Sequence, residues 1–205
     1  PIKDGKVLDD LRIRAALPTL DLLHKKGAAE IILLAHLGRP DGKVLESLKL
    51  APVEKRAGEL TAVPFELREN LRFDPREEAN DESFAQELAA LGDVLNEAFA
   101  DSHRAHASIL GIPKFLPSYV GLRFEEEVRR LSLALTPPNG ALAIIGGAKF
   151  KTKVPIIKKL LEIYEQVLLG GALANDLIKA RGIPFGGSLV SDTPVPEEIA
   201  SNKRL

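Results

Sequence analysis

The sequence predicts an α/β protein with mainly parallel strands, and three features point to this fold class. Short apolar runs such as AEIILLA at 29–35 and ALAIIGG at 141–147 alternate with segments of helical periodicity. These runs are short enough for strands and apolar enough for burial on both faces of a parallel sheet. Glycines stand where one pattern gives way to the next. Regular alternation of this kind favours a layered α/β architecture.

The first part of the chain alternates expected helices and strands. Leucines at helical spacing and basic residues near the end predict a helix over 15–26, which Gly27 ends. The strand AEIILLA follows, and a second helix is expected over 50–60. A third begins in the polar segment 80–83 and ends at Gly92, before a strand-like stretch, GDVLNEAF.

An amphipathic helix is expected over 123–135, and the break TPPNG follows it. Beyond this break, strand, double glycine and helix occur twice, in ALAIIGG with KTKVPIIKKLLEIY and in QVLLGG with ALANDLIKARG. We therefore expect an N-terminal parallel-sheet domain over 1–122, an interdomain helix over 123–135 and the start of a second α/β domain over 136–205.

Composition restricts the classes of function. The chain has 205 residues, 45% hydrophobic and 28% charged, and no apolar run approaches the length of about 18 that spans a bilayer. With no leader evident at its start, we expect a cytoplasmic protein. The absence of cysteine excludes disulfides and thiolate metal sites. A net charge of -1, only 2 Tyr and no Trp argue against a nucleic-acid binder, so any anion site must be a local cluster.

A loop with distinctive chemistry follows the apolar run at 31–34. The segment AHLGRPDGK places His36 and Arg39 close together between glycines and a proline. Ligands of α/β sheets bind beyond the carboxyl ends of the strands, and Gly38 and Pro40 can fix the directions of these side chains. The loop is either a ligand-binding loop or a plain turn with a solvated arginine and a histidine at its edge.

Three more arginines occupy comparable positions, where a structured run gives way to a loop: Arg12 in DDLRIR, Arg72 in ENLRFDP and Arg104 in SHRAHAS. A guanidinium keeps its charge and offers a planar fork of donors, which suits an anion with both phosphate and carboxylate groups. If these side chains converge, they form an acid-binding cluster. If they do not, each is an ordinary surface arginine.

The histidines carry a weaker signal. His103 and His106 are three apart and could share one helical face as a metal pair. The sequence offers no third histidine nearby and no HExxH pattern, so it gives a zinc site little support. We expect instead that they orient the Arg104 loop or satisfy backbone groups, and that His24 caps a helix end.

The double glycines suggest a second site. Gly147 follows a strand, and Lys149 and Lys153 are four apart, so that a helix would present them on one face. Backbone N–H groups at such a helix start favour phosphate. Gly170 and Gly171 repeat the arrangement one unit later, and together the two turns could form the floor of a nucleotide pocket. The alternative is a pair of tight turns with solvated lysines.

Taken in order, these motifs resemble those of the phosphoglycerate kinase family along nearly the whole chain: DDLRI, LLAHLGRP, ENLRF, EEAND, NEAFADSHRAHAS, IIGGAK and LLGGALANDLIKARG. The resemblance implies two α/β domains facing each other across a cleft, the second Rossmann-like and nucleotide-binding. It implies a monomeric glycolytic kinase that transfers a phosphoryl group reversibly between ATP and 3-phosphoglycerate, with Mg²⁺. Hinge motion through the helix over 123–135 is also implied.

The resemblance assigns roles to individual residues. The phosphoglycerate would be bound by Arg12, His36, Leu37, Gly38, Arg39, Arg72 and Arg104. The nucleotide would be bound by Gly147, Lys149, Lys153, Gly170 and Gly171. Lys149, which would stabilise the phosphoryl group in flight, and Arg39 would be the catalytic residues. This agrees with phosphoryl transfer as a reaction that needs positioning and charge neutralisation.

The sequence also departs from the family's pattern. The family's RVDxNVP-like first strand has no counterpart, ELTAVPFELRENLRF is short, and the late glycine-rich turn with its Mg-associated Asp is missing. A competing hypothesis is therefore a truncated, catalytically inert module that binds phosphoglycerate without transferring anything.

Overall fold

The computed structural model describes residues 2–3 and 5–205, which divide into two compact units, Pro1–Arg129 and Arg130–Leu205. The division falls inside helix α5 (Leu122–Leu135), which the sequence predicts as the interdomain helix. The domains predicted from the sequence, 1–122 and 136–205, lie on either side of this helix. Their limits as functional domains stay a prediction.

The first unit contains short strands, four helices besides the start of α5, and several single turns among its described residues. Its elements are β1 (Ile2–Lys3), β2 (Lys6–Val7), α1 (Leu11–Lys25), β3 (Ile32–Leu33), η1 (Glu46–Leu48), α2 (Ala51–Leu60), β4 (Glu66–Leu67), η2 (Leu71–Phe73), α3 (Pro75–Glu78), α4 (Glu82–Ala89), β5 (Val94–Asn96), η3 (Phe99–Asp101), the π-helical turn η4 (Ala107–Gly111), η5 (Ile112–Lys114) and β6 (Ser118–Val120).

Two parallel strand pairs organise this unit. Strand β3 pairs with β4, placing Leu33 opposite Leu67, and β5 pairs with β6, placing Leu95 opposite Tyr119. The core lies where α4 meets η4 and η5, with Phe84, Leu88 and Ile112 buried. Burial of side chains of this size is worth about 1.5–3 kcal/mol each.

Helices form in all six of the predicted regions, but the predicted bounds of the first helix and of the first strand are wrong. Helix α1 starts at Leu11 rather than at residue 15, because Asp9 accepts the N–H of Leu11 at 2.9 Å and Asp10 accepts Arg14 Nε at 2.8 Å in the first turn. The strand predicted over 29–35 shrinks to Ile32–Leu33, because β4 offers only two residues for pairing.

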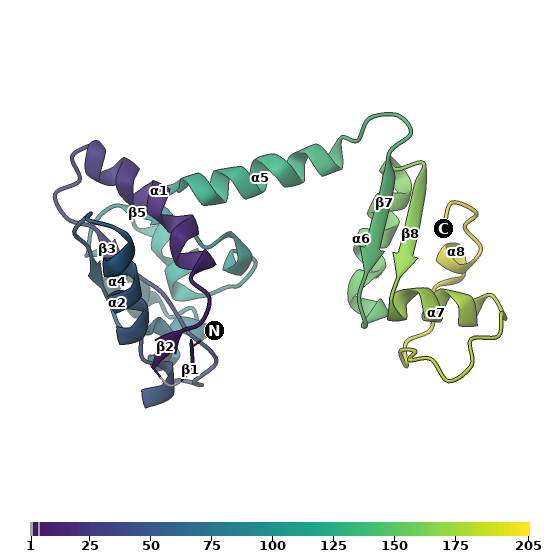
Figure 1. Ribbon diagram of the computed structural model, residues 1–205, viewed down its shortest axis with the longest axis horizontal. Helices are drawn as coiled ribbons and strands as arrows, with labels where there is room; N and C mark the ends of the chain where they lie inside the picture. Colours follow the sequence, from purple (N-terminus) through teal and green to yellow (C-terminus); the bar gives the residue numbers. More distant parts are fainter. Residues whose placement is uncertain (1, 4) are drawn as a thin grey trace. The chain divides into compact units, whose positions relative to one another are not determined.

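The second unit is built on a longer parallel pair, β7 (Leu142–Gly146) and β8 (Gln166–Gly170), with Gly146 opposite Gly170. Figure 1 shows these two strands side by side, with α6 (Phe150–Ile163) and α7 (Ala172–Ala180) beside them and the short α8 (Glu197–Ala200) near the end of the chain. These elements follow the predicted order of strand, double glycine and helix. The predicted α/β fold class with parallel strands is confirmed.

The β7–β8 pair has two unlike faces. Ala143 and Val167 are buried with Phe150 and Ile157 of α6 in one core cluster. The alternating residues Leu142, Ile144 and Leu168 are exposed, so the opposite face of the pair has no cover among the described residues.

Side chains from two other elements hold the start of α5. Thr19 Oγ1 of α1 accepts the N–H of Leu122 at 3.1 Å and donates to Glu97. Glu97 in turn accepts the N–H groups of Arg123 and Phe124 at 3.2 and 3.1 Å. The first N–H groups of a helix lack partners within it, so this arrangement supplies the cap of α5.

Candidate functional site

The loops after three strands of the first unit meet around one carboxylate. His36 follows β3, Arg72 follows β4, and Arg104 follows β5. The carboxylate belongs to Asp101, at the end of the turn η3, and lies 3.4 Å from His36 Nε2, 3.4 Å from Arg72 Nη2 and 2.8 Å from Arg104 Nε. Three of the five cationic or imidazole residues predicted to bind substrate therefore lie together.

The loop that carries His36 is held by side chains from the segment after β4. Asn70 Nδ2 donates to the carbonyl oxygens of Leu37 and Leu48 at 2.8 and 3.0 Å, and Arg72 Nη1 donates to that of Gly38 at 3.0 Å. Gly38 has φ +68°, and a Cβ there would lie 2.8 Å from Leu48 Cδ2. Only glycine fits this position without strain, which gives the loop a fixed course.

Arg72 is the buried member of the cluster, with 5% of its surface exposed. A buried charge is costly unless it is paired. Asp101 is one partner, and Glu78 lies 3.6 Å from Arg72 Nε, yet this Nε–H has no hydrogen-bond partner among the described residues. The guanidinium is therefore incompletely satisfied.

The electrostatics of the cluster favour a neutral His36. Burial, followed by the charge of Arg72, lowers the pKa of His36. His106 and Arg104 add to this, while Asp101 opposes it. The loss of a proton leaves the imidazole able to donate or accept one hydrogen bond at each nitrogen, according to its tautomer.

Arg39 and Arg12 are not part of this contact network. Arg39 is exposed in the same loop as His36 and makes no hydrogen bond or ion pair within the described part of the chain. Arg12 is exposed in the first turn of α1. Arg14 of α1 and Arg56 of α2 both bind Asp10, and their hydrogen bonds lower the pKa of Asp10, that from Arg14 most. Within residues 2–3 and 5–205, Arg12 thus makes no hydrogen bond or ion pair with the cluster.

The two histidines of SHRAHAS differ in environment. His103 is exposed in a turn, so the shared helical face considered for a metal pair does not form. His106 is buried with Nδ1 3.7 Å from Oε1 of Glu77, and Glu77 also accepts the N–H and Oγ–H of Ser108 at 3.0 and 2.5 Å. Residues 2–3 and 5–205 contain no group of three or more acidic or imidazole side chains placed to hold a metal ion.

In the second unit, the two double-glycine turns adjoin. Gly147 and Gly171 have φ +152° and +61°, and the carbonyl oxygen of Gly147 accepts the N–H of Leu173 at 3.2 Å. Helices α6 and α7 start at the carboxyl ends of β7 and β8, so their N-termini lie on the edge where α/β proteins bind ligands.

The predicted lysines lie at this edge. Lys149 occupies the N-cap position of α6 and is exposed. Lys153 is in the first turn, and its Cε would lie 3.5 Å from a Cβ at Gly147. The cationic groups therefore stand beside the glycine turns, while Gly170 ends β8 opposite Gly146.

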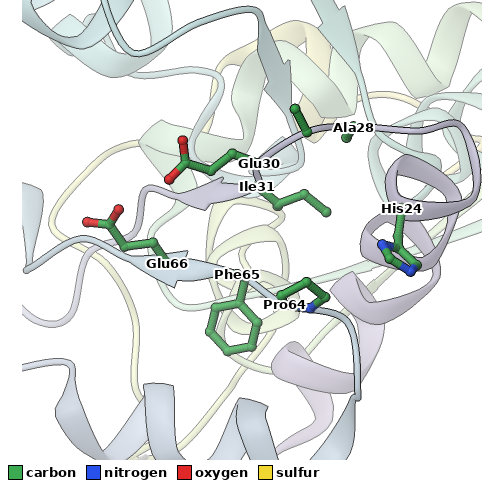
Figure 2. Close-up of a pocket in the computed structure, with 8 residues that line it drawn as sticks. His24, Ala28, Glu30, Ile31, Pro64, Phe65 and Glu66 are labelled. Atoms are coloured by element: carbon green, nitrogen blue, oxygen red, sulfur yellow. The ribbon is translucent and has the colours of Figure 1, made fainter.

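A cavity of about 220 Å³ lies at the other edge of the first strand pair. Figure 2 shows its lining side chains, among them Ile31 just before β3 and Phe65 just before β4, with His24 from the last turn of α1. These residues precede the strands, whereas His36 and Arg72 follow them. The cavity is thus separate from the Asp101 cluster.

Comparison with known proteins identifies the family of this chain. A family model described as phosphoglycerate kinase matches residues 1–204. The chain belongs to the phosphoglycerate kinase family. The resemblance seen in the motifs is confirmed.

Curated relatives agree. The phosphoglycerate kinase of Roseiflexus sp. (strain RS-1) is 45% identical over 223 residues, which cover 96% of this chain and 56% of the relative. That of Moorella thermoacetica is 42% identical over 221 residues, with the same coverage. The chain spans about half the length of these relatives. The matches are also longer than the 205 residues of the chain, so the relatives contain internal residues that this chain lacks.

Solved structures lead to the same family. The phosphoglycerate kinase from Coxiella burnetii superposes with a TM-score of 0.83 at 34% identity, covering 94% of this chain and 54% of that one. The phosphoglycerate kinase from Pyrococcus horikoshii OT3 gives 0.73 at 26% identity, covering 91% and 54%.

Sequence reasoning missed the residues that hold the cluster together. Asp101 received no role, although its place three residues before Arg104 is compatible with an ion pair across one turn. Asn70 also received none, although it lies within the motif ENLRF. Glu77 and Glu97 lie within the motifs EEAND and NEAFADSHRAHAS, but their roles could not be predicted, because their partners lie 20 or more residues away in the chain.

Proposed function

We propose that the protein of which this chain is all or part is a glycolytic phosphoglycerate kinase, cytoplasmic and monomeric. It transfers a phosphoryl group reversibly between ATP and 3-phosphoglycerate. In the direction of ATP use, the bond between the γ-phosphorus and the β–γ bridging oxygen breaks. A bond from that phosphorus to a carboxylate oxygen of 3-phosphoglycerate forms, giving 1,3-bisphosphoglycerate and ADP.

The observation that carries the proposal is the meeting of His36, Arg72 and Arg104 from three different loops of the first unit. A small acid with a phosphate and a carboxylate needs several fixed donors, and guanidinium forks supply them. Arg39 would add a charge from the same loop as His36, and the backbone of Leu37 and Gly38 sets the course of that loop.

The second unit would bind the nucleotide. The glycine turns at Gly147 and at Gly170 and Gly171 leave room for a close approach of backbone to ligand, and Lys149 and Lys153 bring positive charge to the same edge. A lysine ammonium near the γ-phosphate stabilises charge that spreads over the phosphoryl oxygens in the transition state.

Magnesium is expected with ATP by family resemblance alone. The described residues offer no group of acidic or imidazole side chains that could hold a metal ion, so the residues present do not make a protein site for it. We assign no step of the reaction to the metal.

Binding of the acid tests the role of the first unit. Titration calorimetry of the purified chain should detect one site for 3-phosphoglycerate. Arg39→Ala should weaken binding roughly 10- to 100-fold, because a hydrogen bond to a charged group is worth about 1.5–3 kcal/mol. Arg68→Ala, which removes an exposed arginine paired with Glu66 at 3.0 Å, is the matched control. Equal affinities for all three proteins would contradict the assignment of Arg39.

Turnover tests the role of Lys149. Formation of ADP from ATP and 3-phosphoglycerate should fall at least 100-fold in kcat for Lys149→Ala with little change in KM, because the proposed contact is made mainly in the transition state. Lys151→Ala, an exposed neighbour in α6, should stay near the parent rate. If the chain binds the acid but shows no turnover, and its intact mass is near 22.2 kDa, the alternative of an inert phosphoglycerate-binding module is favoured.

A further inference from the structure

We propose that Asp101 is a built-in competitor of the acid substrate, occupying the cations of the first unit until an anion replaces it. The inference rests on the proposed function only in naming the acid as 3-phosphoglycerate, since the competition itself concerns any small oxyanion. It assigns Asp101 as a residue that sets affinity at this site.

The first support is the position of the carboxylate. Asp101 Oδ1 lies 2.8 Å from Arg104 Nε and 3.4 Å from Arg72 Nη2, while Oδ2 lies 3.4 Å from His36 Nε2. These donors come from three separate loops and share this one acceptor. An anion that uses the same donors must therefore displace the carboxylate from at least one of them.

The second support is that Asp101 accepts hydrogen bonds from the donors of the cluster only incompletely. Two of its three contacts lie near the outer limit for a hydrogen bond. The buried Nε–H of Arg72 has no hydrogen-bond partner among residues 2–3 and 5–205. A phosphate has more acceptor oxygens than a carboxylate, so it can satisfy more of these donors at once.

The third support is that the carboxylate can leave. A quarter of the Asp101 side chain is exposed, so water can solvate the displaced group. The backbone of the turn is held separately, because Asp101 donates its N–H to Ala98 at 3.0 Å and accepts the N–H of Arg104 at 2.9 Å. Displacement therefore needs rotation of one side chain rather than loss of the turn.

The competition predicts the direction of a substitution. Asp101→Asn keeps the size of the side chain and one acceptor oxygen but removes the negative charge. Binding of 3-phosphoglycerate and of inorganic phosphate should tighten about fivefold, as expected for removal of a partly exposed opposing charge. If Asp101 served only to orient the cations, the same substitution would weaken binding or leave it unchanged.

The test is calorimetric titration of the full chain with 3-phosphoglycerate and, separately, with inorganic phosphate, at one pH and ionic strength. Glu87→Gln is the matched control, because it removes a carboxylate from the exposed Arg76–Glu87 pair (2.7 Å) of the same unit. A second measurement needs no variant: the Nε–H resonance of Arg104 in the parent protein should shift on addition of inorganic phosphate.

The possible outcomes test the inference and the proposed function separately. Tighter binding of both ligands by Asp101→Asn, but not by Glu87→Gln, supports the inference. Unchanged or weaker binding by Asp101→Asn, or a static Arg104 signal in the presence of bound ligand, overturns it and leaves the proposed function standing. Tighter phosphate binding without any 3-phosphoglycerate binding supports the competitor and overturns the proposed substrate. No anion binding by any of the proteins overturns both.

Discussion

At the scale of single residues, the cluster shows how a buried arginine is tolerated. Arg72 is nearly enclosed, and its guanidinium divides its donors between the Gly38 carbonyl oxygen and the Asp101 carboxylate. The first contact fixes the His36 loop, and the second joins it to the loop after β5. Arg72 thus connects the loops of the candidate site, while Arg104 is partly exposed and Arg39 is exposed.

His36 should give the stability of the first unit a pH dependence. Because the pKa of His36 is lowered, chiefly by burial and then by Arg72, the unfolded chain takes up this proton at a higher pH than the folded chain. Its contribution to stability is fully present above the unfolded value of about 6.5 and is lost as the pH falls through the folded pKa.

The measurement is urea unfolding between pH 7.5 and 5, with an NMR titration of the imidazole. His36→Gln should show a shallower fall in the free energy of unfolding than the parent protein over this range. An identical fall in both proteins, or an imidazole that titrates above about 6.5, would rule this effect out.

The sequence alone indicated the residues of the candidate site, but it did not indicate their hydrogen-bond partners. In HLGRP and SHRAHAS, the change from apolar residues to histidine and arginine pointed to His36, Arg39 and Arg104. The role of Asp101 depends on where three loops meet, which is a tertiary property. The motif DDLRI likewise does not reveal that Arg12 is exposed in the first turn of α1, outside the hydrogen bonds and ion pairs of the cluster.

At the scale of elements, the cap of α5 requires a glycine at position 121. A Cβ at Gly121 would overlap the carboxylate of Glu97, the group that caps the helix. The edge-to-face contact of Phe99 with Phe124, 5.2 Å between ring centroids, fixes the first turn of α5 from another direction.

Substitution of two glycines should therefore have opposite effects on stability. Gly121→Ala should lower the free energy of unfolding by about 1–3 kcal/mol, because Glu97 must give up helix-capping hydrogen bonds. Gly58→Ala, in α2 with no atom within 4 Å of the new Cβ, should raise it by about 0.5–1 kcal/mol through helix propensity. Urea unfolding monitored by circular dichroism measures both, and equal effects would contradict the role of Glu97.

Helices were predicted better than strands for a physical reason. A helix such as α2 or α4 satisfies its hydrogen bonds locally, so periodicity and the N-cap residue Asp81 suffice to locate it. A strand exists only where a neighbour pairs with it. The apolar run around β3 is seven residues in sequence but only two in the ladder, because its partner β4 is equally short.

At the scale of the whole molecule, the residues that the structure describes form two hydrophobic cores with no residue in common. The first surrounds Phe84 and Ile112, and the second surrounds Phe150 and Ile157. Each cluster lies within one compact unit. A substitution that weakens packing in one core should therefore speed hydrogen exchange first at the backbone amides of its own unit.

Neighbouring isoleucines of α6 provide the test. Ile157 is fully buried, and Ile157→Ala should destabilise the second unit by about 2–5 kcal/mol. Ile156 is 49% exposed, and Ile156→Ala should cost much less. Hydrogen exchange should show faster exchange in α6 and β8 for Ile157→Ala, with α4 unchanged. Equal acceleration in α4 would mean that the two cores unfold together.

The exposed apolar face of β7 and β8 should limit the solubility of this chain at high concentration. Ile144, at the middle of β7, is 74% exposed and lies with Leu142 and Leu168 on the exposed apolar face of the strand pair. Such faces adhere to one another and lead to precipitation. A lysine at Ile144 would remove no contact from the core around Ile157, so this one position offers a way to improve solubility while leaving the fold intact.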